Sequence, residues 1–322
     1  MSFSVTVITD CTPDTVVEVV SNSTKPLVLK GLIADWPAVN GGIDGVRQFA
    51  ASTPVTAMVG EPAIKGRFFY NQSMDDFNFQ RKRVPLPEVL NQIERFKDVP
   101  NPPAFYVGST SVAQCLPGFS AENNLPLSQL LPLSQQPPLV SAWMGNQSRI
   151  AAHYDVPDNI ACVVSGKRRF TLFPPTQISN LYVGPIDFTP AGQAISLVDF
   201  DQPDLERFPQ FTTALKYAQI AELEAGDGLF IPSMWWHHVE ALDSFNLLIN
   251  YWWRQSPAYM GAPMDALRHS LLSIRDLPDE QRQAWAEIFD HYIFNPDENI
   301  LPPLDEMAAR KLRALLINKL NR

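Results

Sequence analysis

The apolar residues in the middle of the chain form short runs, and each run is bounded by glycine, proline or serine. Short apolar runs between turn-forming residues are typical of β-strands, and several in succession indicate a sandwich or a barrel. The sequence therefore predicts a mainly β core. Its strands are expected at 139–144, 160–164, 167–173, 228–231 and 245–253.

Shorter elements surround this core in the sequence. A long insertion, 176–222, separates two of the core strands and carries an acidic stretch, Asp199-Phe200-Asp201, which is most simply a solvated loop. The other elements expected from the local pattern are helices at 15–22, 86–96 and 212–218 and strands at 26–30, 63–70 and 104–107.

The last part of the chain has the pattern of amphipathic helices. Apolar residues from Met264 to Ile274 recur at intervals of three or four, and Pro278 followed by two acids is typical of a helix start. A further apolar stripe runs through 304–320. We therefore predict a mainly β domain over 1–256 and a C-terminal helical region over 257–322.

Composition and charge disfavour several classes of protein. The 322 residues are 45% hydrophobic and carry a net charge of −9, from 34 acids and 25 bases. Non-specific binding to nucleic acid needs a basic surface, so that role is disfavoured, and the run Arg81-Lys82-Arg83 is most simply a solvated loop. Three cysteines without a CxxC pair, no secretory leader and no membrane-spanning apolar stretch predict a reduced, cytoplasmic protein.

Candidate metal ligands lie in two short segments. The first is His153-Tyr154-Asp155, and the second contains His237, 84 positions further on. In an extended strand, residues i and i+2 point to the same side, so His153 and Asp155 converge while Tyr154 points away. Two histidines and one carboxylate form the donor set that holds non-haem Fe(II) with coordination positions left open. We predict that a second strand brings His237 beside the first.

The second segment contains two adjacent histidines, and strand alternation distinguishes them. His237 shares a strand face with Val239 and Ala241, whereas His238 shares one with Glu240. The apolar face is the one expected to line the interior. His237 is therefore the predicted ligand, and His238 is expected to be half-exposed and hydrogen-bonded to the backbone or to Glu240.

These segments resemble a known family. The motifs that carry the resemblance are HYD at 153–155, Asn159, GKRRFTLFPP at 166–175, GDGLFIPSMWWHHVE at 226–240, NYWW at 250–253 and GLIADWPA at 31–38. Together they are similar to the jumonji-C, cupin-like branch of the 2-oxoglutarate oxygenases, in particular to the factor-inhibiting-HIF-like hydroxylases. The resemblance implies a double-stranded β-helix (jelly-roll) core with flanking helices. It also implies Fe(II) held by His153, Asp155 and His237, and 2-oxoglutarate as a co-substrate that is decarboxylated to succinate.

The resemblance further implies which residues bind 2-oxoglutarate. The family places a lysine two residues after the glycine of the returning strand, and this chain has Arg168 there, flanked by Lys167 and Arg169 as alternatives. Arginine binds carboxylates in a bidentate manner but is bulkier than lysine. Where relatives have a carboxylate-binding threonine, this chain has Ile150 in the pocket wall. The other residues that match the family's pocket are Tyr106, Asn159, Asn250 and the wall residue Trp252.

Three functions are compatible with these residues. The first is hydroxylation of a protein side chain, the second is a metal-binding cupin-like module without oxygenase activity, and the third is hydroxylation of a modified tRNA base, as in a related branch. The resemblance also implies a homodimer formed through the C-terminal helices. A peptide substrate would bind on loops carried by the rigid core. The loops expected to frame the pocket are 176–220 and 60–85, the latter with Arg67, Phe69, Tyr70 and Phe77.

Overall fold

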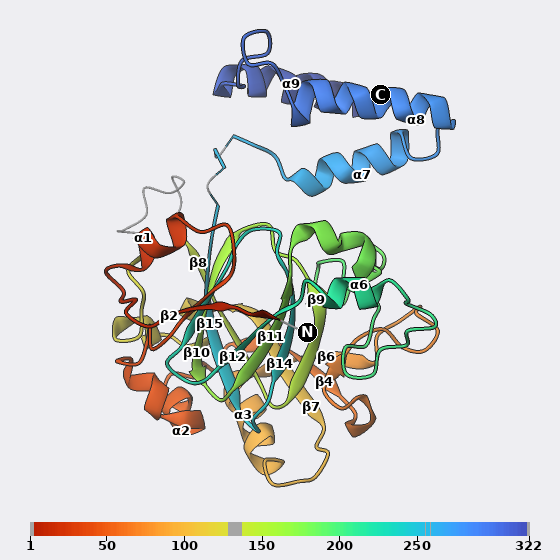
Figure 1. The fold of residues 1–322 in the computed structure, drawn as a ribbon. Coiled ribbons are helices and arrows are strands. Elements are labelled where there is room, and N and C mark those ends of the chain that lie inside the picture. The colour runs from red at the N-terminus through yellow and green to blue at the C-terminus, as the bar shows by residue number, and fades with distance from the viewer. Residues whose placement is uncertain (1–2, 128–136, 255, 258, 321–322) are drawn as a thin grey trace. The chain divides into compact units, whose positions relative to one another are not determined.

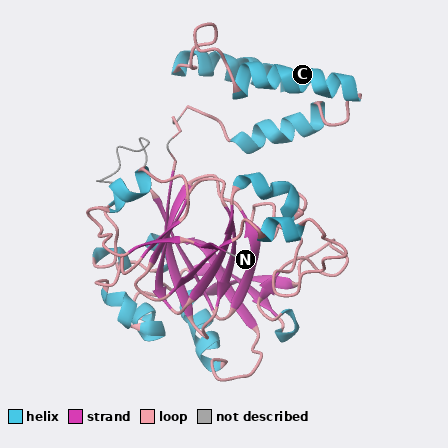
Figure 2. Ribbon diagram, viewed as in Figure 1, coloured by secondary structure: helices cyan, strands magenta, loops and turns pink. Residues whose placement is uncertain are grey.

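The computed structural model describes residues 3–127, 137–254, 256–257 and 259–320. The chain divides into two compact units, Met1–Arg254 and Gln255–Arg322. In the first unit the strands lie at the centre and the helices at the periphery (Figure 1 and Figure 2). None of the described helices is both long and apolar enough to cross a membrane.

The smaller sheet of the first unit has six strands. In spatial order they are β1 (Phe3–Ser4), β12 (Gln219–Leu223), β11 (Arg168–Phe173), β14 (Trp236–Ala241), β9 (Ser148–His153) and β5 (Arg67–Phe68). Strand β14 pairs antiparallel with β11 on one side and with β9 on the other. Strands far apart in the sequence therefore become neighbours, and the two segments with candidate metal ligands meet.

The larger sheet has nine strands. In spatial order they are β2 (Thr6–Ile8), β3 (Leu27–Leu29), β13 (Gly228–Ile231), β10 (Asp158–Ser165), β15 (Asn246–Trp253), β8 (Leu139–Gly145), β7 (Ala104–Ser111), β4 (Pro54–Gly60) and β6 (Phe79–Pro85). Strand β10 is buried along nearly its whole length, as its continuous apolar run predicts. The two sheets form a mostly antiparallel sandwich, and the predicted mainly β, cupin-like fold class is confirmed.

Two predictions for the chain before the core are wrong. The expected strand at 63–70 is instead the 3-10 helix η2 (Pro62–Ile64), a turn and the two-residue β5. Lys65 and Gly66 in the turn have φ values of 49° and 77°, and a strand cannot continue through left-handed residues. The run Arg81-Lys82-Arg83, expected in a loop, lies within β6.

Helices cover the first unit because each has an apolar side to bury. The amphipathic helix α3 (Leu86–Arg95) buries Leu86, Val89, Leu90 and Ile93, which lie at helical spacing on one face. The other helical segments of this unit are α1 (Val16–Ser21), η1 (Pro37–Asn40), α2 (Gly42–Arg47), α4 (Val112–Cys115), η3 (Phe119–Ala121), η4 (Pro175–Leu181) and α6 (Phe211–Leu215).

The second unit is helical in its described residues. It contains α7 (Pro263–Ser273), α8 (Asp279–Phe289), the π-helical turn η5 (Asp290–Phe294) and α9 (Glu306–Leu320). Among the described residues from 254 onward, none is buried. Large apolar side chains are therefore exposed here, among them Leu272 at 88% and Phe294 at 71%.

Candidate functional site

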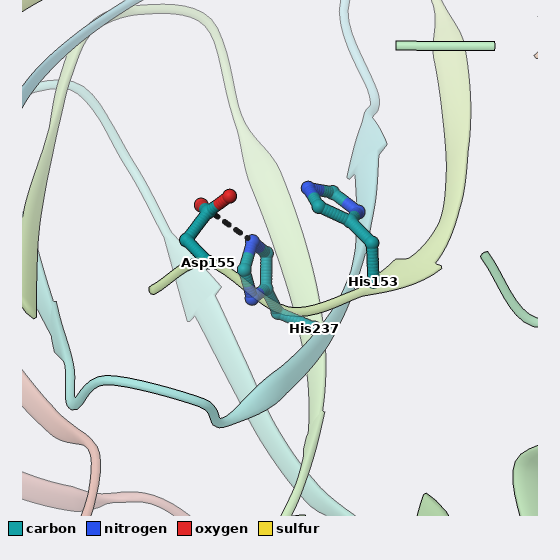
Figure 3. Close-up of side chains that lie close together, drawn as sticks. All are labelled: His153, Asp155 and His237. Atoms are coloured by element: carbon teal, nitrogen blue, oxygen red, sulfur yellow. Dashed lines mark ion pairs between the residues drawn. The ribbon is translucent and has the colours of Figure 1, made fainter. Parts of the chain in front are cut away.

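Strands β9 and β14 place the two predicted histidine ligands directly opposite each other. His153, the last residue of β9, pairs with His237 of β14, and their ring centroids lie 4.3 Å apart. Asp155 follows two residues later, and the three side chains point toward one another (Figure 3). Their ligand atoms all lie within 4.8 Å of one another. Tyr154 packs edge-on against Trp236, away from this group, as strand alternation predicts.

The turn between β13 and β14 holds the segment that carries Asp155. The backbone N–H of Met234 donates to the carbonyl oxygen of Asp155 at 2.9 Å. The backbone N–H of Ser233 donates to Oδ1 of Asp158 at 2.9 Å, and its hydroxyl donates to the carbonyl oxygen of Val156 at 2.5 Å. Because these bonds link the two ligand-bearing segments directly, Asp155 is fixed relative to His237.

Backbone contacts determine which nitrogen of each histidine is free. Nδ1 of His153 lies 2.9 Å from the carbonyl oxygen of Ala151, and Nδ1 of His237 lies 3.0 Å from that of Trp235. A carbonyl oxygen only accepts hydrogen bonds, so each Nδ1 carries the proton. Each Nε2 is therefore the ring nitrogen left to bind a metal, and this arrangement is typical of histidines that bind a metal.

The protonation states of the group suit a divalent metal. Burial and the nearby His237 lower the pKa of His153 to about 4, so its ring is neutral at physiological pH. Burial alone would raise the pKa of Asp155, but the nearby His237 and His153 outweigh that effect and lower it; Nε2 of His237 lies 3.5 Å from Oδ2 of Asp155. Two imidazoles and one carboxylate form a donor set that fits Fe(II).

A cavity of about 310 Å³ lies between the two sheets, with the His153, Asp155 and His237 group in its wall. The strands of both sheets contribute side chains to it, most of them apolar. The remaining residues predicted for the site also line this cavity: Tyr106, Ile150, Asn159, Arg168, Asn250 and Trp252.

Arg168 is a buried cation in this cavity. Its side chain is 3% exposed, and Nη2 donates to the carbonyl oxygen of Trp143 at 3.1 Å. Its Nε has no hydrogen-bond partner, and Arg168 forms no ion pair with any residue that the structure describes. Burial lowers its pKa to about 10, an effect that Tyr106 partly offsets, so the guanidinium is charged at neutral pH.

The neighbours of Arg168 pair with exposed glutamates outside the cavity. Lys167 pairs with Glu224 at 2.8 Å, and Arg169 pairs with Glu222 at 2.8 Å. Of the three cations that the sequence left open for a co-substrate carboxylate, Arg168 is the one that lines the cavity.

Polar groups near Arg168 form a short chain through a residue that the sequence did not identify. Nε1 of Trp143 donates to Oδ1 of Asn250 at 2.7 Å, and Nδ2 of Asn250 donates to Oδ1 of Asn159 at 3.4 Å. Trp143 also lies against Trp252, with ring centroids 5.6 Å apart. Only the pairing of β8 with β15 indicates that Trp143 belongs to the site, because it places Trp143 opposite Leu248, another cavity residue.

The prediction for His238 is wrong. This side chain is 6% exposed rather than half-exposed, and its ring stacks on Phe200 with centroids 4.6 Å apart. Its Nδ1 has no partner among the described residues. Burial, together with the charge of Arg149, lowers the pKa of His238 to about 3. The ring therefore stays neutral beneath the insertion.

The acidic stretch of the insertion also differs from the expected solvated loop. Asp199 lies 3.5 Å from Arg67 of β5 and 3.8 Å from Arg149 of β9, and Asp201 lies 2.9 Å from Arg149. These ion pairs attach the insertion to the edge of the smaller sheet. Phe200 is thereby held over His238.

The loops expected to frame the pocket do so with other residues than those predicted. Arg67, Phe69, Tyr70 and Phe77 do not line the cavity. Three of them join the 60–85 segment to the insertion instead: Arg67 pairs with Asp199, the Tyr70 hydroxyl donates to the carbonyl oxygen of Phe188 at 2.6 Å, and Phe77 stacks on Phe188. The two segments contribute other residues to the lining, namely Phe68, Pro190, Ala191, Gln193 and Ile195.

Comparison with known proteins identifies the family. The model of the cupin-like domain family matches residues 13–259, which include every residue of the site. The chain belongs to this family. The resemblance of its motifs to the jumonji-C, cupin-like branch is thereby confirmed.

Similar proteins differ widely in their names. The lysine-specific demethylase JMJ31 of Arabidopsis thaliana is 36% identical over 36% of this chain and 21% of its own length. The tRNA wybutosine-synthesizing protein 5 of Mus musculus is 32% identical over 42% of this chain and 44% of its own length. HSPB1-associated protein 1 of Homo sapiens is 33% identical over 35% of this chain and 23% of its own length. The chain thus matches less than half the length of each.

Proposed function

We propose that this protein is an Fe(II)- and 2-oxoglutarate-dependent oxygenase that hydroxylates a side chain of a protein substrate. One observation carries the proposal: the cavity that holds two histidines and a carboxylate also holds Arg168, a buried cation without an ion-pair partner among the described residues. An unpaired buried charge is costly, so Arg168 favours an anionic ligand. 2-Oxoglutarate has a metal-chelating 2-oxo acid at one end and a carboxylate at the other.

The residues of the chain bind and orient the reactants. His153 and His237 offer Nε2 because backbone carbonyls hold their Nδ1 protons, and Asp155 partly neutralises a divalent ion. When bound, Fe(II) and 2-oxoglutarate supply the activation of O2 and the oxidation of a C–H bond. Arg168 binds the distal carboxylate by charge-assisted hydrogen bonds. Burial raises the pKa of Tyr106 to about 12, so its hydroxyl keeps its proton and can donate to the same carboxylate.

The cavity and the net charge favour a polypeptide substrate. Apart from the metal ligands and Arg168, the residues that line the cavity are uncharged, which suits a neutral side chain. One relative is named as a lysine-specific demethylase, and another is named for tRNA wybutosine synthesis. A tRNA base is therefore the second candidate, but the net charge of −9 opposes binding of a polynucleotide.

We also propose that two chains associate through residues 257–322. The described residues of this unit include none that is buried, so the unit lacks a core of its own to offset the loss of chain entropy. A second copy of the same apolar surface would cover side chains such as Leu312 and Leu316, which are 52% and 50% exposed. Light scattering should give the mass of two chains, and Leu312→Glu with Leu316→Glu should give one. A single-chain mass for the unaltered protein would refute the dimer.

Turnover tests the oxygenase proposal. The Fe(II)-loaded protein, supplied with 2-oxoglutarate and O2, should form succinate, and a member of a peptide panel should raise the rate. Asp155→Ala should abolish succinate formation, whereas Lys167→Ala, a change at the outer-face ion pair, should not. Metal binding without succinate would favour the binding-module function. Stimulation by tRNA instead of peptides would favour the second candidate.

A further inference from the structure

Two basic triplets in this chain have opposite electrostatic surroundings. In Lys167-Arg168-Arg169, two side chains pair with glutamates and the third is buried in the cavity. In Arg81-Lys82-Arg83, all three residues are exposed, and none lies within ion-pair distance of a carboxylate in the described part of the chain. The second triplet is therefore a concentration of uncompensated positive charge on a protein whose net charge is −9.

The uncompensated triplet lies on a strand edge. Strand β6 is the last strand of the larger sheet and pairs with β4 on one side. No strand among the described residues pairs with its other side. Such an edge presents backbone N–H and C=O groups at the spacing of a β-strand, which another extended polypeptide can match.

The register of the sheet connects this edge to the cavity. Arg81 lies opposite Met58 of β4, and Met58 lies opposite Tyr106 of β7, so the three form one row across the sheet. Both Met58 and Tyr106 line the cavity. Two interstrand spacings place Arg81 about 10 Å from Tyr106 along this row. Nη2 of Arg81 also donates at 2.6 Å to the carbonyl oxygen of Pro190, another cavity residue.

We propose that the free edge of β6 is a docking site for an acidic, extended segment of the polypeptide substrate, which adds to the larger sheet as a further strand. This inference rests on the proposed function in taking the substrate to be a polypeptide. The binding of an acidic strand to the edge of β6 does not depend on oxygenase activity. Acidic side chains on the added strand would lie opposite Arg81, Lys82 and Arg83, where opposite charges attract. The residue to be hydroxylated would lie further along the substrate, beyond the docked strand.

The charges on β6 argue against two other occupants. A second copy of β6 would place like charges opposite one another, which is destabilising. RNA would use the positive charges but cannot form the backbone ladder that a strand edge offers. The simplest alternative is that the charges only prevent edge-to-edge aggregation, as lysines on edge strands commonly do. In that case the triplet would affect self-association and would bind no peptide.

Fluorescence anisotropy with a defined probe tests the docking site. The probe is a labelled peptide of about eight residues, with a central run of glutamates between valine and threonine residues, long enough to span β6. Replacing Arg81, Lys82 and Arg83 by Gln should weaken binding about tenfold or more, since three charge-assisted contacts are removed. The matched control replaces Lys25, Lys97 and Lys216, which are exposed and lie elsewhere, by Gln and should bind as the unaltered protein does.

Two further probes separate strand addition from simple charge attraction. Methylating alternate backbone nitrogens on the bonding side of the peptide should abolish binding, because it removes the ladder donors without changing the charge. Asp155→Ala should bind the probe normally, so a failure of the oxygenase proposal would not be mistaken for a failure of docking. Equal binding by the Arg81, Lys82 and Arg83 variant, equal binding of the methylated peptide, or tighter binding of a single-stranded RNA of the same charge would each overturn the inference.

Discussion

The two ends of the cavity differ in whether their polar groups have hydrogen-bond or charge partners within the protein. At the metal end, both Nδ1 atoms contact carbonyl oxygens, and Asp155 and His237 lie 3.5 Å apart. At the other end, Arg168 has a buried Nε without a partner and no carboxylate beside it in the described residues. Leu172 of β11 lies opposite His237. Arg168 lies four positions before Leu172 on the same strand, which corresponds to roughly 13 Å.

This difference indicates separate roles for the two ends. The metal end is organised by short-range contacts, so its geometry does not depend on a co-substrate. The Arg168 end carries a positive charge that favours an anion, and the carboxylate of the proposed co-substrate would supply its missing interactions. Substitutions at one end should therefore change one binding event and leave the other nearly intact.

The largest expected effect comes from removing the carboxylate at the metal end. Asp155→Ala should weaken divalent metal binding by at least about 100-fold and abolish turnover. Loss of a residue that only hydrogen-bonds to a metal ligand already lowers metal affinity by up to about 100-fold, and Asp155 is a predicted ligand itself. Calorimetric titration with Mn(II) measures the affinity, and circular dichroism checks the fold. Asp201→Ala is the control, since that acid pairs with Arg149 outside the cavity. Unchanged metal affinity in Asp155→Ala would break the assignment of this end.

A change at the other end should have the complementary result. Arg168→Ala should raise the KM for 2-oxoglutarate about 10- to 100-fold, the range expected for losing a charge-assisted hydrogen bond. Mn(II) affinity should stay within about threefold of the unaltered protein because Arg168 is not a ligand. Arg168→Lys should recover part of the loss, because the charge is restored. A variant that lost metal and co-substrate binding together would show that the two ends are not separate.

Acid should affect the metal end and not the Arg168 end. In the metal-free protein, the pKa of His153 is lowered to about 4 by burial and by His237, so between about pH 6.5 and 4 the unfolded chain binds more protons than the folded one. The free energy of unfolding should therefore decrease as the pH is lowered from about 6.5 to about 4. This group alone should contribute on the order of 1 kcal/mol per pH unit. His238 contributes in the same direction.

Urea unfolding at several pH values measures this dependence. His153→Asn should have a smaller slope than the unaltered protein, whereas Arg168→Lys should not, since the pKa values of Arg168 and Tyr106, about 10 and about 12, lie outside the range. Identical slopes for His153→Asn and the unaltered protein would contradict the neutral, buried state of this histidine.

The smallest effect concerns the hydrogen bond between Trp143 and Asn250. Trp143→Phe keeps an aromatic wall but removes the donor to Oδ1 of Asn250, which lies 2.7 Å away. Loss of one neutral hydrogen bond of about 1 kcal/mol should weaken 2-oxoglutarate binding about fivefold, with metal binding unchanged. Trp285→Phe, in the C-terminal unit, is the matched control. An effect on metal binding would place this contact with the metal end instead.

Local sequence pattern was sufficient for the metal end. Strand alternation put His153 and Asp155 on one side of Tyr154, and the apolar neighbours of His237 distinguished it from His238. The structure places these residues as the alternation implies, because the register of β14 with β9 sets His237 opposite His153, before the register shift that follows His237. The core strands were predictable for the same reason.

Contacts between distant segments account for what the sequence could not predict. His238 alternates as a solvent-facing residue should, but Phe200, 38 positions away, covers it. Trp143 joins the pocket only through the pairing of β8 with β15. Three adjacent cations in β6 hid its strand character, since an edge strand can carry consecutive exposed charges.

Titration of the metal-loaded protein with 2-oxoglutarate tests the central claim most directly. With Mn(II) in the site and O2 excluded, calorimetry should show one molecule bound per chain. Either Asp155→Ala or Arg168→Ala should weaken that binding by at least about tenfold, because each removes one of the two groups that the co-substrate spans. Binding that is unaffected by both substitutions, or no binding to the unaltered protein, would contradict the assignment of this cavity to 2-oxoglutarate.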